Sequence, residues 1–170
     1  MFFGINQYHT FQIERKKGLA EFGDKEIEVT IRDWLDDPIF KFQRRQVDSN
    51  HFFQFVVTDE SSRPVTITRT KLKPTQLSLT TAIILGEKHR QKYETLNSPE
   101  KEKVVHTIRI EMARYGIGCS GIHIKLERAV LSDTVLLDNS LTEFYLRQRI
   151  FYVTGAFALY SEVIEMALSE

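Results

Sequence analysis

The sequence predicts an α+β fold in which an antiparallel β-sheet of about five strands packs against helices. Residues 40–85 are predicted to form most of the sheet, because apolar and polar side chains alternate there between short turns. Segments 24–35 and 98–115 carry apolar residues at helical spacing on either side of it. The chain then closes with residues 141–168, which lack proline and are predicted to form one long helix.

The first helix is predicted to begin at Asp24, because aspartate favours the N-cap position. It is expected to end at 36–38, where Pro38 pushes the preceding residue out of the helical region. Between these limits lies one apolar stripe, formed by Ile27, Ile31, Trp34 and Leu35. We assign residues 1–23 to an N-terminal extension, whose order the sequence does not fix, and residues 24–170 to a single domain.

Four strands are predicted next, and their short connections favour an antiparallel meander. Segments 40–47 and 51–58 form a hairpin around the turn at 48–50, followed by strands at 65–68 and 76–85. Alternation places four aromatic side chains on an apolar face that needs a helical cover, namely Phe40, Phe42, Phe53 and Phe55.

Two middle helices are predicted at 87–96 and 98–115. Ser98 is expected to cap the second of them, with Pro99 at its first position and Gly116 at its C-terminal end. A fifth strand follows at 122–126, and 129–139 is expected to stay extended as far as a turn at its end.

The closing helix has the clearest start signal, because 140–143 reads Ser-Leu-Thr-Glu and fits a capping box. Apolar residues then keep a coiled-coil-like spacing, while Phe144, Phe151, Ala158 and Leu159 add apolar surface on another flank. Two interpretations follow: a central helix buried within its own domain, or a helix with one flank on the sheet and the other on a second copy. The candidate interface consists of Leu146, Ile150, Val153, Phe157, Tyr160 and Ile164.

Composition narrows the function classes. The chain has 170 residues, of which 42% are apolar, so it can bury a core. Its 23 basic residues balance 23 acidic ones, which disfavours a nucleic-acid partner and lets copies associate without net repulsion. No signal peptide is recognisable, and the most apolar segment, 150–160, is too short to span a membrane. We therefore expect a cytoplasmic protein without a membrane partner.

The residues that could carry chemistry are few. The five histidines lie at least 17 residues apart, and one cysteine supports neither a disulfide nor a cysteine-based zinc site, so we predict no metal, cofactor or catalytic residue. Residues 116–121 match G-x-G-x-x-G, but a helix precedes them and a strand follows, the reverse of a dinucleotide site. An alternative interpretation is a small-molecule or enzyme pocket formed by Cys119 with His106 or His123.

A second alternative is an RNA-binding sheet, which would expose Phe53 and Phe55 for base stacking. The alternation instead favours both side chains as core residues. The sequence thus leaves an interaction module, a small-molecule site and an RNA-binding sheet to be distinguished by where these side chains lie.

Several segments resemble a mainly archaeal family of domains of unknown function with a type III secretion chaperone-like fold. The first is residues 82–86 together with 87–93, which follow directly. The others are 99–103 at the start of the next helix, 116–119 at its end, and Leu141-Thr142 at the start of the last helix. The similarity covers residues 24–168. It implies no catalytic residues, but the fold's better-known members are small dimers that bind extended segments of partner proteins. We therefore expect a non-catalytic, chaperone- or adaptor-like homodimer with a protein partner and no cofactor.

Overall fold

The computed structural model describes residues 19–60, 63–122 and 128–169. Its elements in chain order are the 3-10 helix η1 (Leu19–Glu21), α1 (Asp24–Leu35), β1 (Lys41–Arg44), β2 (His51–Thr58), β3 (Pro64–Thr70), β4 (Gln76–Ile84), α2 (Glu87–Glu94), α3 (Ser98–Arg114), β5 (Gly118–Ser120), β6 (Arg128–Leu136) and α4 (Glu143–Ala167). The four α-helices and six strands among these residues confirm the predicted α+β class.

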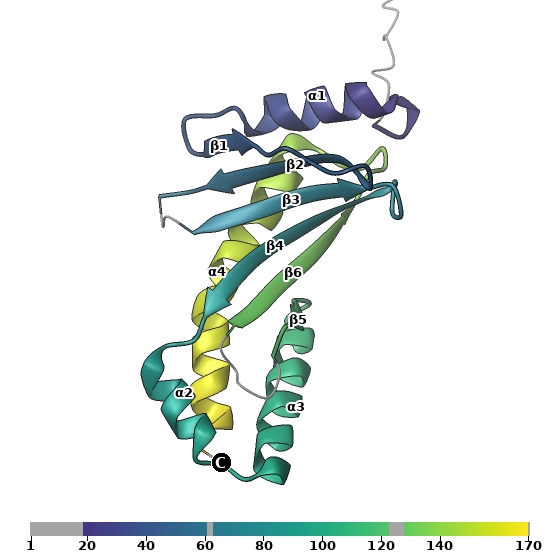
Figure 1. Ribbon diagram of the computed structural model, residues 1–170. Coiled ribbons are helices and arrows are strands. Elements are labelled where there is room, and N and C mark those ends of the chain that lie inside the picture. The colour runs from purple at the N-terminus through teal and green to yellow at the C-terminus, as the bar shows by residue number, and fades with distance from the viewer. Residues whose placement is uncertain (1–18, 61–62, 123–127, 170) are drawn as a thin grey trace, which may run out of the picture.

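The strands form one antiparallel sheet in the order β1-β2-β3-β4-β6-β5 (Figure 1). The predicted meander is confirmed for β1 to β4, because each of these strands pairs with the next. The chain then leaves the sheet through α2 and α3 before β6 returns to pair with β4 along nine residues, Arg128 to Leu136. The three-residue β5 pairs with the outer edge of β6 and ends the sheet on that side.

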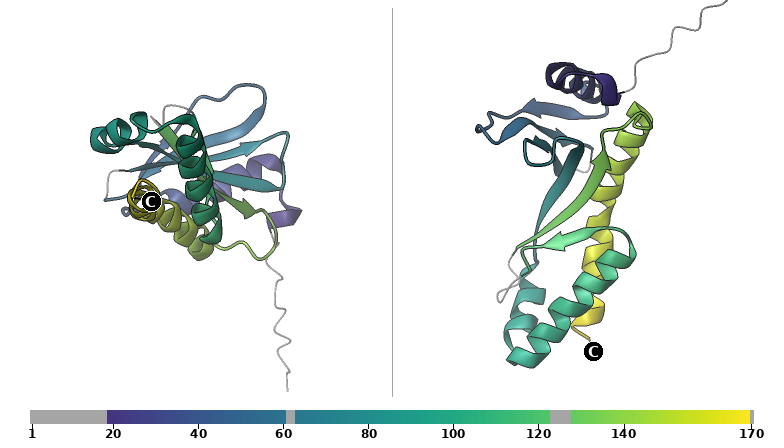
Figure 2. Two further views of the ribbon diagram at one scale, coloured as in Figure 1. Left: turned by 90° about the horizontal axis from the view of Figure 1, so that it is seen from below. Right: turned by 90° about the vertical axis from the view of Figure 1, so that its right-hand side faces the viewer.

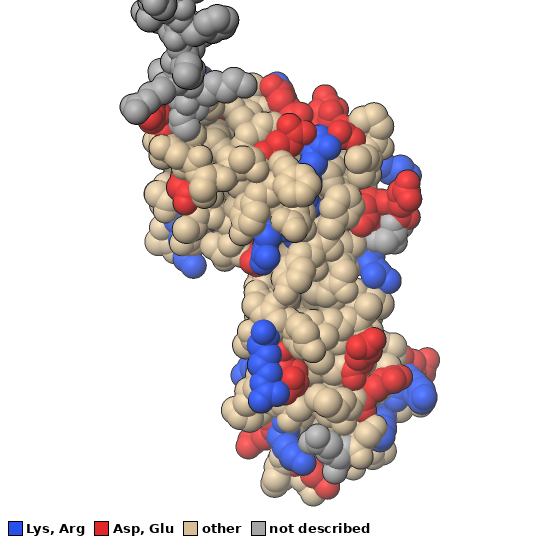
Figure 3. All heavy atoms as spheres, turned by 180° about the vertical axis from the view of Figure 1, so that it is seen from behind, with Lys and Arg blue, Asp and Glu red and all other residues tan. Residues whose placement is uncertain are grey.

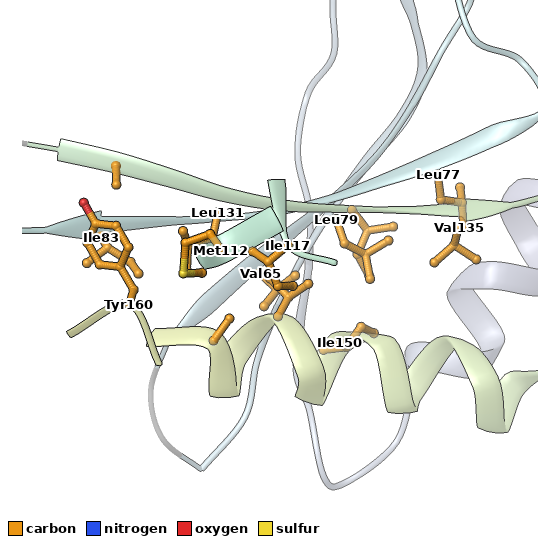
Figure 4. Packing of buried hydrophobic residues seen from close by; sticks show 14 of the residues in the cluster. Val65, Leu77, Leu79, Ile83, Met112, Ile117, Leu131, Val135, Ile150 and Tyr160 are labelled. Atoms are coloured by element: carbon orange, nitrogen blue, oxygen red, sulfur yellow. The ribbon is translucent and has the colours of Figure 1, made fainter. Parts of the chain in front are cut away.

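One face of the sheet carries the core. Phe53, Phe55 and Leu79 point to this face and are fully buried, which confirms the expected core position of the two phenylalanines. α4 runs along this face, and α1 covers it beside β1 and β2 (Figures 1 and 2). Figure 4 shows the contact from close by, with Leu79 pointing from the sheet towards α4 and Ile150 pointing back from the helix.

The opposite face of the sheet carries hydroxyl side chains in register, and no described helix lies over it (Figure 2). Its hydroxyl side chains are half-buried or exposed, whereas Val56 of β2, in register with Thr66, is buried. The hydroxyl side chains form two rows across β3, β4 and β6, with Thr66, Thr80 and Ser132 in the first and Thr68, Ser78 and Thr134 in the second.

The length of α4 follows from its having two sets of packing partners. The helix has 25 residues, which corresponds to about 37 Å at 1.5 Å per residue. Its N-terminal half packs on the sheet through Leu146 and Ile150, whereas its C-terminal half continues past the sheet and lies beside α2 and α3 (Figure 1). Much of its apolar surface is therefore used within one chain.

α1 and α3 begin at Asp24 and Ser98 as predicted, but the residues that cap them lie one position earlier. The N-cap of α1 is Gly23 rather than Asp24, and the N-cap of α3 is Asn97 rather than Ser98, because the Asn97 side chain accepts a hydrogen bond from the amide of Glu100. The predicted capping box from residue 140 to residue 143 is also wrong. Ser140 instead donates to Asp138, and Thr142 caps α4 by accepting from the amide of Tyr145.

One predicted strand is shorter than expected, because β1 ends at Arg44 instead of continuing to residue 47. The structure has a short strand at Gly118–Ser120, whereas the strand predicted at 122–126 falls almost wholly on residues that the structure does not describe. Residues 123–127 lie outside the described residues, as do residues 1–18 of the predicted extension. Of that extension, Leu19 is buried in the core, and the amide of Ala20 donates to the side chain of Asn139.

Candidate functional site

The apolar seam predicted on the last helix faces inward. Five of its six residues are at most 1% exposed and belong to the core: Leu146, Ile150, Val153, Tyr160 and Ile164. The sixth, Phe157, is half-buried, and the guanidinium carbon of Arg63 lies 3.8 Å from the centre of its ring. The seam is thus used within one chain, and the exposed surface of α4 is its other flank.

That other flank is exposed and uncharged. We call it the outward face of α4 and define it by seven exposed residues: Phe144, Tyr145, Gln148, Phe151, Tyr152, Gly155 and Ala158. Phe144 is 77% exposed and Phe151 is 44% exposed. Solvated helix faces normally carry charged or polar residues, so a face with four aromatic side chains and one amide is typical of a contact surface.

The charged residues next to this face are held by partners to its sides. Arg147 binds Asp37 at 2.7 Å and Glu143 at 2.7 Å, and it donates to the backbone carbonyl of Trp34. Arg149 points the other way, towards β6, and binds Asp133 at 2.6 Å. The guanidinium groups therefore anchor α4 to its own chain. Figure 3 shows the side of the molecule opposite to Figure 1, with an uncharged band across its middle and charges gathered above and below.

Two contacts fix aromatic side chains of the outward face. The ring of Phe151 packs on the buried Phe40, with the ring centres 5.4 Å apart. The hydroxyl of Tyr152 donates to the carbonyl of Tyr115, the residue that ends α3. These two side chains are therefore held in place by contacts within their own chain.

Hydrophobicity alone does not distinguish a contact helix from a membrane helix. α4 is long and apolar enough to cross a membrane by length and composition. A core helix of a soluble protein passes the same test, and nine residues of α4 are buried against its own chain.

The structure does not place Cys119 and His106 in one pocket, as the sequence-based alternative requires. Cys119 is half-buried on β5, and burial raises the pKa of its thiol to about 11, against a smaller opposing effect of Arg109. His106 is exposed on α3 and lines a cavity of about 810 Å³, but Cys119 is not among the described residues that line it. His123 lies outside the described residues. The raised pKa keeps Cys119 protonated at neutral pH, which disfavours a nucleophilic role.

The structure also places the two other motifs. α3 ends before Gly116, whose φ of 68° lies in the left-handed region, and β5 begins at Gly118, so the glycine-rich segment joins a helix to a strand as predicted. Phe53 and Phe55 are fully buried, which removes the exposed aromatic platform that the RNA-binding alternative requires. In the described ranges, no group of three or more His, Cys, Asp or Glu residues could hold a metal ion.

Sequence reasoning identified Phe144, Phe151 and Ala158 as a second apolar flank but placed the candidate interface on the seam. It did not single out Tyr145, Tyr152 and Gly155 as members of the same face. Their positions along the helix could have identified them. With 100° of rotation per residue, each lies more than about 90° around the helix axis from the centre of the seam.

Comparisons with known proteins agree with this architecture. Residues 27–164 match the family described as "Uncharacterized conserved protein (DUF2299)". A crystal structure of an uncharacterized protein from Methanothermobacter thermautotrophicus is similar in fold, with a TM-score of 0.69 and 17% sequence identity over 83% of this chain and 98% of that one. No curated protein matches the chain significantly.

Proposed function

The chain belongs to this family of uncharacterized conserved proteins, and from that premise we propose that it is a non-catalytic protein-binding module that acts as a homodimer. The observation that carries the proposal is the outward face of α4, an exposed and uncharged aromatic surface on a helix whose opposite side already forms the core. The resemblance to dimeric type III secretion chaperones supports the same mode of action.

A second copy is the partner that fits this face. In an antiparallel pair of α4 helices, the large Phe144 and Phe151 of one copy lie near the small Gly155 and Ala158 of the other, so that large side chains meet small positions. None of these residues is charged, and the chain has a formal net charge of zero, so like charges do not oppose the contact. From Phe144 to Ala158 the face spans about 21 Å along the helix at 1.5 Å per residue.

The dimer proposal is tested by sedimentation equilibrium of the purified full chain at micromolar concentration. We expect a dimer for the wild type and a monomer for Phe144→Glu and for Ala158→Glu, because each buries a carboxylate at the contact. Leu72→Glu is the matched control: Leu72 is 88% exposed in the β3–β4 connection, away from α4, so this variant stays dimeric. A wild-type monomer contradicts the proposal, as do dimeric Phe144→Glu and Ala158→Glu variants.

The same dimer leaves the hydroxyl-bearing face of each sheet open to a protein segment. This face is uncharged in its two central rows and offers hydroxyl donors and acceptors at regular spacing. In a pull-down from native lysate, a segment bound there is retained by the wild type and by the control Lys92→Glu, at an exposed position on α2, and is lost by Thr134→Arg, which changes an exposed residue of the second row. A partner that Thr134→Arg retains binds elsewhere.

A further inference from the structure

The described strands place no acidic side chain on the hydroxyl-bearing face of the sheet. Asp133 is the one acidic residue in these strands, and it points to the core face, where it binds Arg149. Asp48, in the turn between β1 and β2, is bound by His51 at 2.5 Å. A negatively charged partner on this face therefore meets no like charge from the strands.

The second hydroxyl row continues to the edge of the sheet and ends at Arg45. The amide of Arg45 donates to the carbonyl of Gln54 at 3.0 Å, so the two residues lie opposite each other. Nε2 of Gln54 donates in turn to Oγ1 of Thr68 at 3.2 Å, and Thr68 pairs with Ser78. Arg45 is exposed, and its guanidinium has no ion-pair partner in the described part of the chain. The row thus has an unpaired cation at its β1 end.

A small pocket lies further along the same row, beside the turn between β3 and β4. Its volume is about 250 Å³, below the roughly 300–1,000 Å³ of small-molecule sites and suited to a side chain. Lys73 is the one charged residue among the described residues that line it, and its exposed ammonium has no ion-pair partner among them. The polar lining side chains are half-buried or exposed, so a ligand can contact them: Thr68, Thr70, Gln76, Ser78 and Thr134.

Two hydroxyls of this pocket already accept a hydrogen bond. Oγ1 of Thr68 accepts from Gln54, and Oγ1 of Thr70 accepts from the amide of Lys73 at 3.2 Å. A hydroxyl also has one O–H donor, and no contact among the described residues uses the donor of either threonine. The pocket therefore offers O–H donors beside an ammonium, which is the chemistry that binds a carboxylate.

The distance between the two cationic positions predicts the spacing of the carboxylates that they bind. From Arg45 to Ser78 the row crosses three strand spacings, which is about 14 Å at roughly 4.8 Å each. Four residues of an extended chain cover about 13 Å. Side chains four positions apart point to the same side of an extended segment, whereas adjacent ones point to opposite sides. Acidic residues at i and i+4 therefore match this row.

We propose that the hydroxyl-bearing face binds an acidic protein segment in extended conformation, with one carboxylate in the pocket at Lys73 and a second at Arg45. This inference rests on the proposed function, because it takes this face as the protein-binding surface and adds the chemistry of the partner. Single-stranded nucleic acid is the competing polyanion. It is disfavoured because neither hydroxyl row contains an aromatic side chain on which bases could stack.

Fluorescence anisotropy of labelled eight-residue peptides with the full chain tests the proposal. The peptides consist of serine and threonine with two glutamates four positions apart, with two adjacent glutamates, or with glutamines four positions apart. We expect the first to bind with a Kd below about 1 mM and at least tenfold more tightly than the neutral peptide. It should bind about fivefold more tightly than the peptide with adjacent glutamates, which presents one carboxylate to the row. An oligothymidylate of eight nucleotides should bind more weakly than the first peptide.

Arg45→Gln and Lys73→Gln each keep a polar side chain but remove a charge, and each should weaken the first peptide about fivefold. Lys92→Gln, at an exposed position on α2, is the matched control and leaves the affinity unchanged. The proposal is overturned by undetectable binding of the first peptide, by equal affinities for the two acidic peptides, by variants without effect, or by tighter binding of the oligothymidylate.

Two further variants separate this result from the proposed function. Phe144→Glu should bind the first peptide with wild-type affinity even as a monomer, because Phe144 lies on α4, away from the hydroxyl-bearing face. A neutral peptide that binds as tightly as the acidic one and is lost in Thr134→Arg would overturn the acidic specificity. The same result would leave the face as a protein-binding surface.

Discussion

Arg149 on α4 donates from Nε to Oδ2 of Asp133 on β6 across 2.6 Å, and this pair joins the long helix to the sheet. The Asp133 side chain is 8% exposed, and its Oδ1 accepts a second bond from the amide of Thr134. The hydrogen bond to Asp133 raises the pKa of Arg149, whose guanidinium also lies over the ring of Tyr152. One carboxylate on the core face of the sheet thus orients an arginine at the edge of the outward face.

We expect Asp133→Asn to lower the free energy of unfolding by about 1–3 kcal/mol, because it leaves a partly buried guanidinium without its anion. Arg149→Met should have a comparable effect, since it leaves the carboxylate of Asp133 buried and unpaired. Urea denaturation of both variants and of the double variant measures the coupling between the two side chains. A coupling free energy near zero would contradict the anchoring role.

The corrected start of α4 gives a second prediction. Thr142→Ala should destabilise the protein by about 1 kcal/mol, because it removes the side-chain oxygen that satisfies the amide of Tyr145. Ser140→Ala is the matched comparison: its hydroxyl binds Asp138 in the preceding turn and not the helix, so we expect a smaller loss. The midpoints of thermal unfolding of the two variants show which residue caps α4. A larger decrease for Ser140→Ala than for Thr142→Ala would support Ser140 as the N-cap, as the sequence predicted.

Most of the fold follows from local patterns in the sequence. Alternation at Phe53 and Phe55 predicts a half-buried strand, and the regular spacing from Leu146 to Ile164 predicts a buried helical stripe. The N-cap residues are harder to predict from the sequence. Neighbouring Asn, Ser, Thr and Asp residues can all cap a helix, and only the backbone angles select one of them. The pairing of β6 with β4 across two helices depends on tertiary packing and has no local signal.

The candidate site was harder to predict than the fold. The seam and the outward face of α4 are both apolar. Hydrophobicity alone therefore does not show which of the two faces is buried within the same chain. The sheet covers Ile150, and Ile83 at the end of β4 lies beside Tyr160 (Figure 4). α3 also packs on α4, and this contact becomes apparent only once the path of the chain between β4 and β6 is known.

The environment of Cys119 gives a prediction about its reactivity. Burial raises the pKa of this thiol to about 11, whereas an unfolded cysteine titrates near about 8.5. Only the thiolate reacts with iodoacetamide, so at pH 8 the native protein should be alkylated more than about a hundredfold more slowly than the unfolded chain. The native rate should keep rising about tenfold per pH unit up to pH 10, while the unfolded rate levels off above its lower pKa. Mass spectrometry follows the reaction without ambiguity, because the chain has one cysteine. A native rate that levels off near pH 8, or that equals the unfolded rate, would show an ionised thiol and would return Cys119 to the candidates for nucleophilic chemistry.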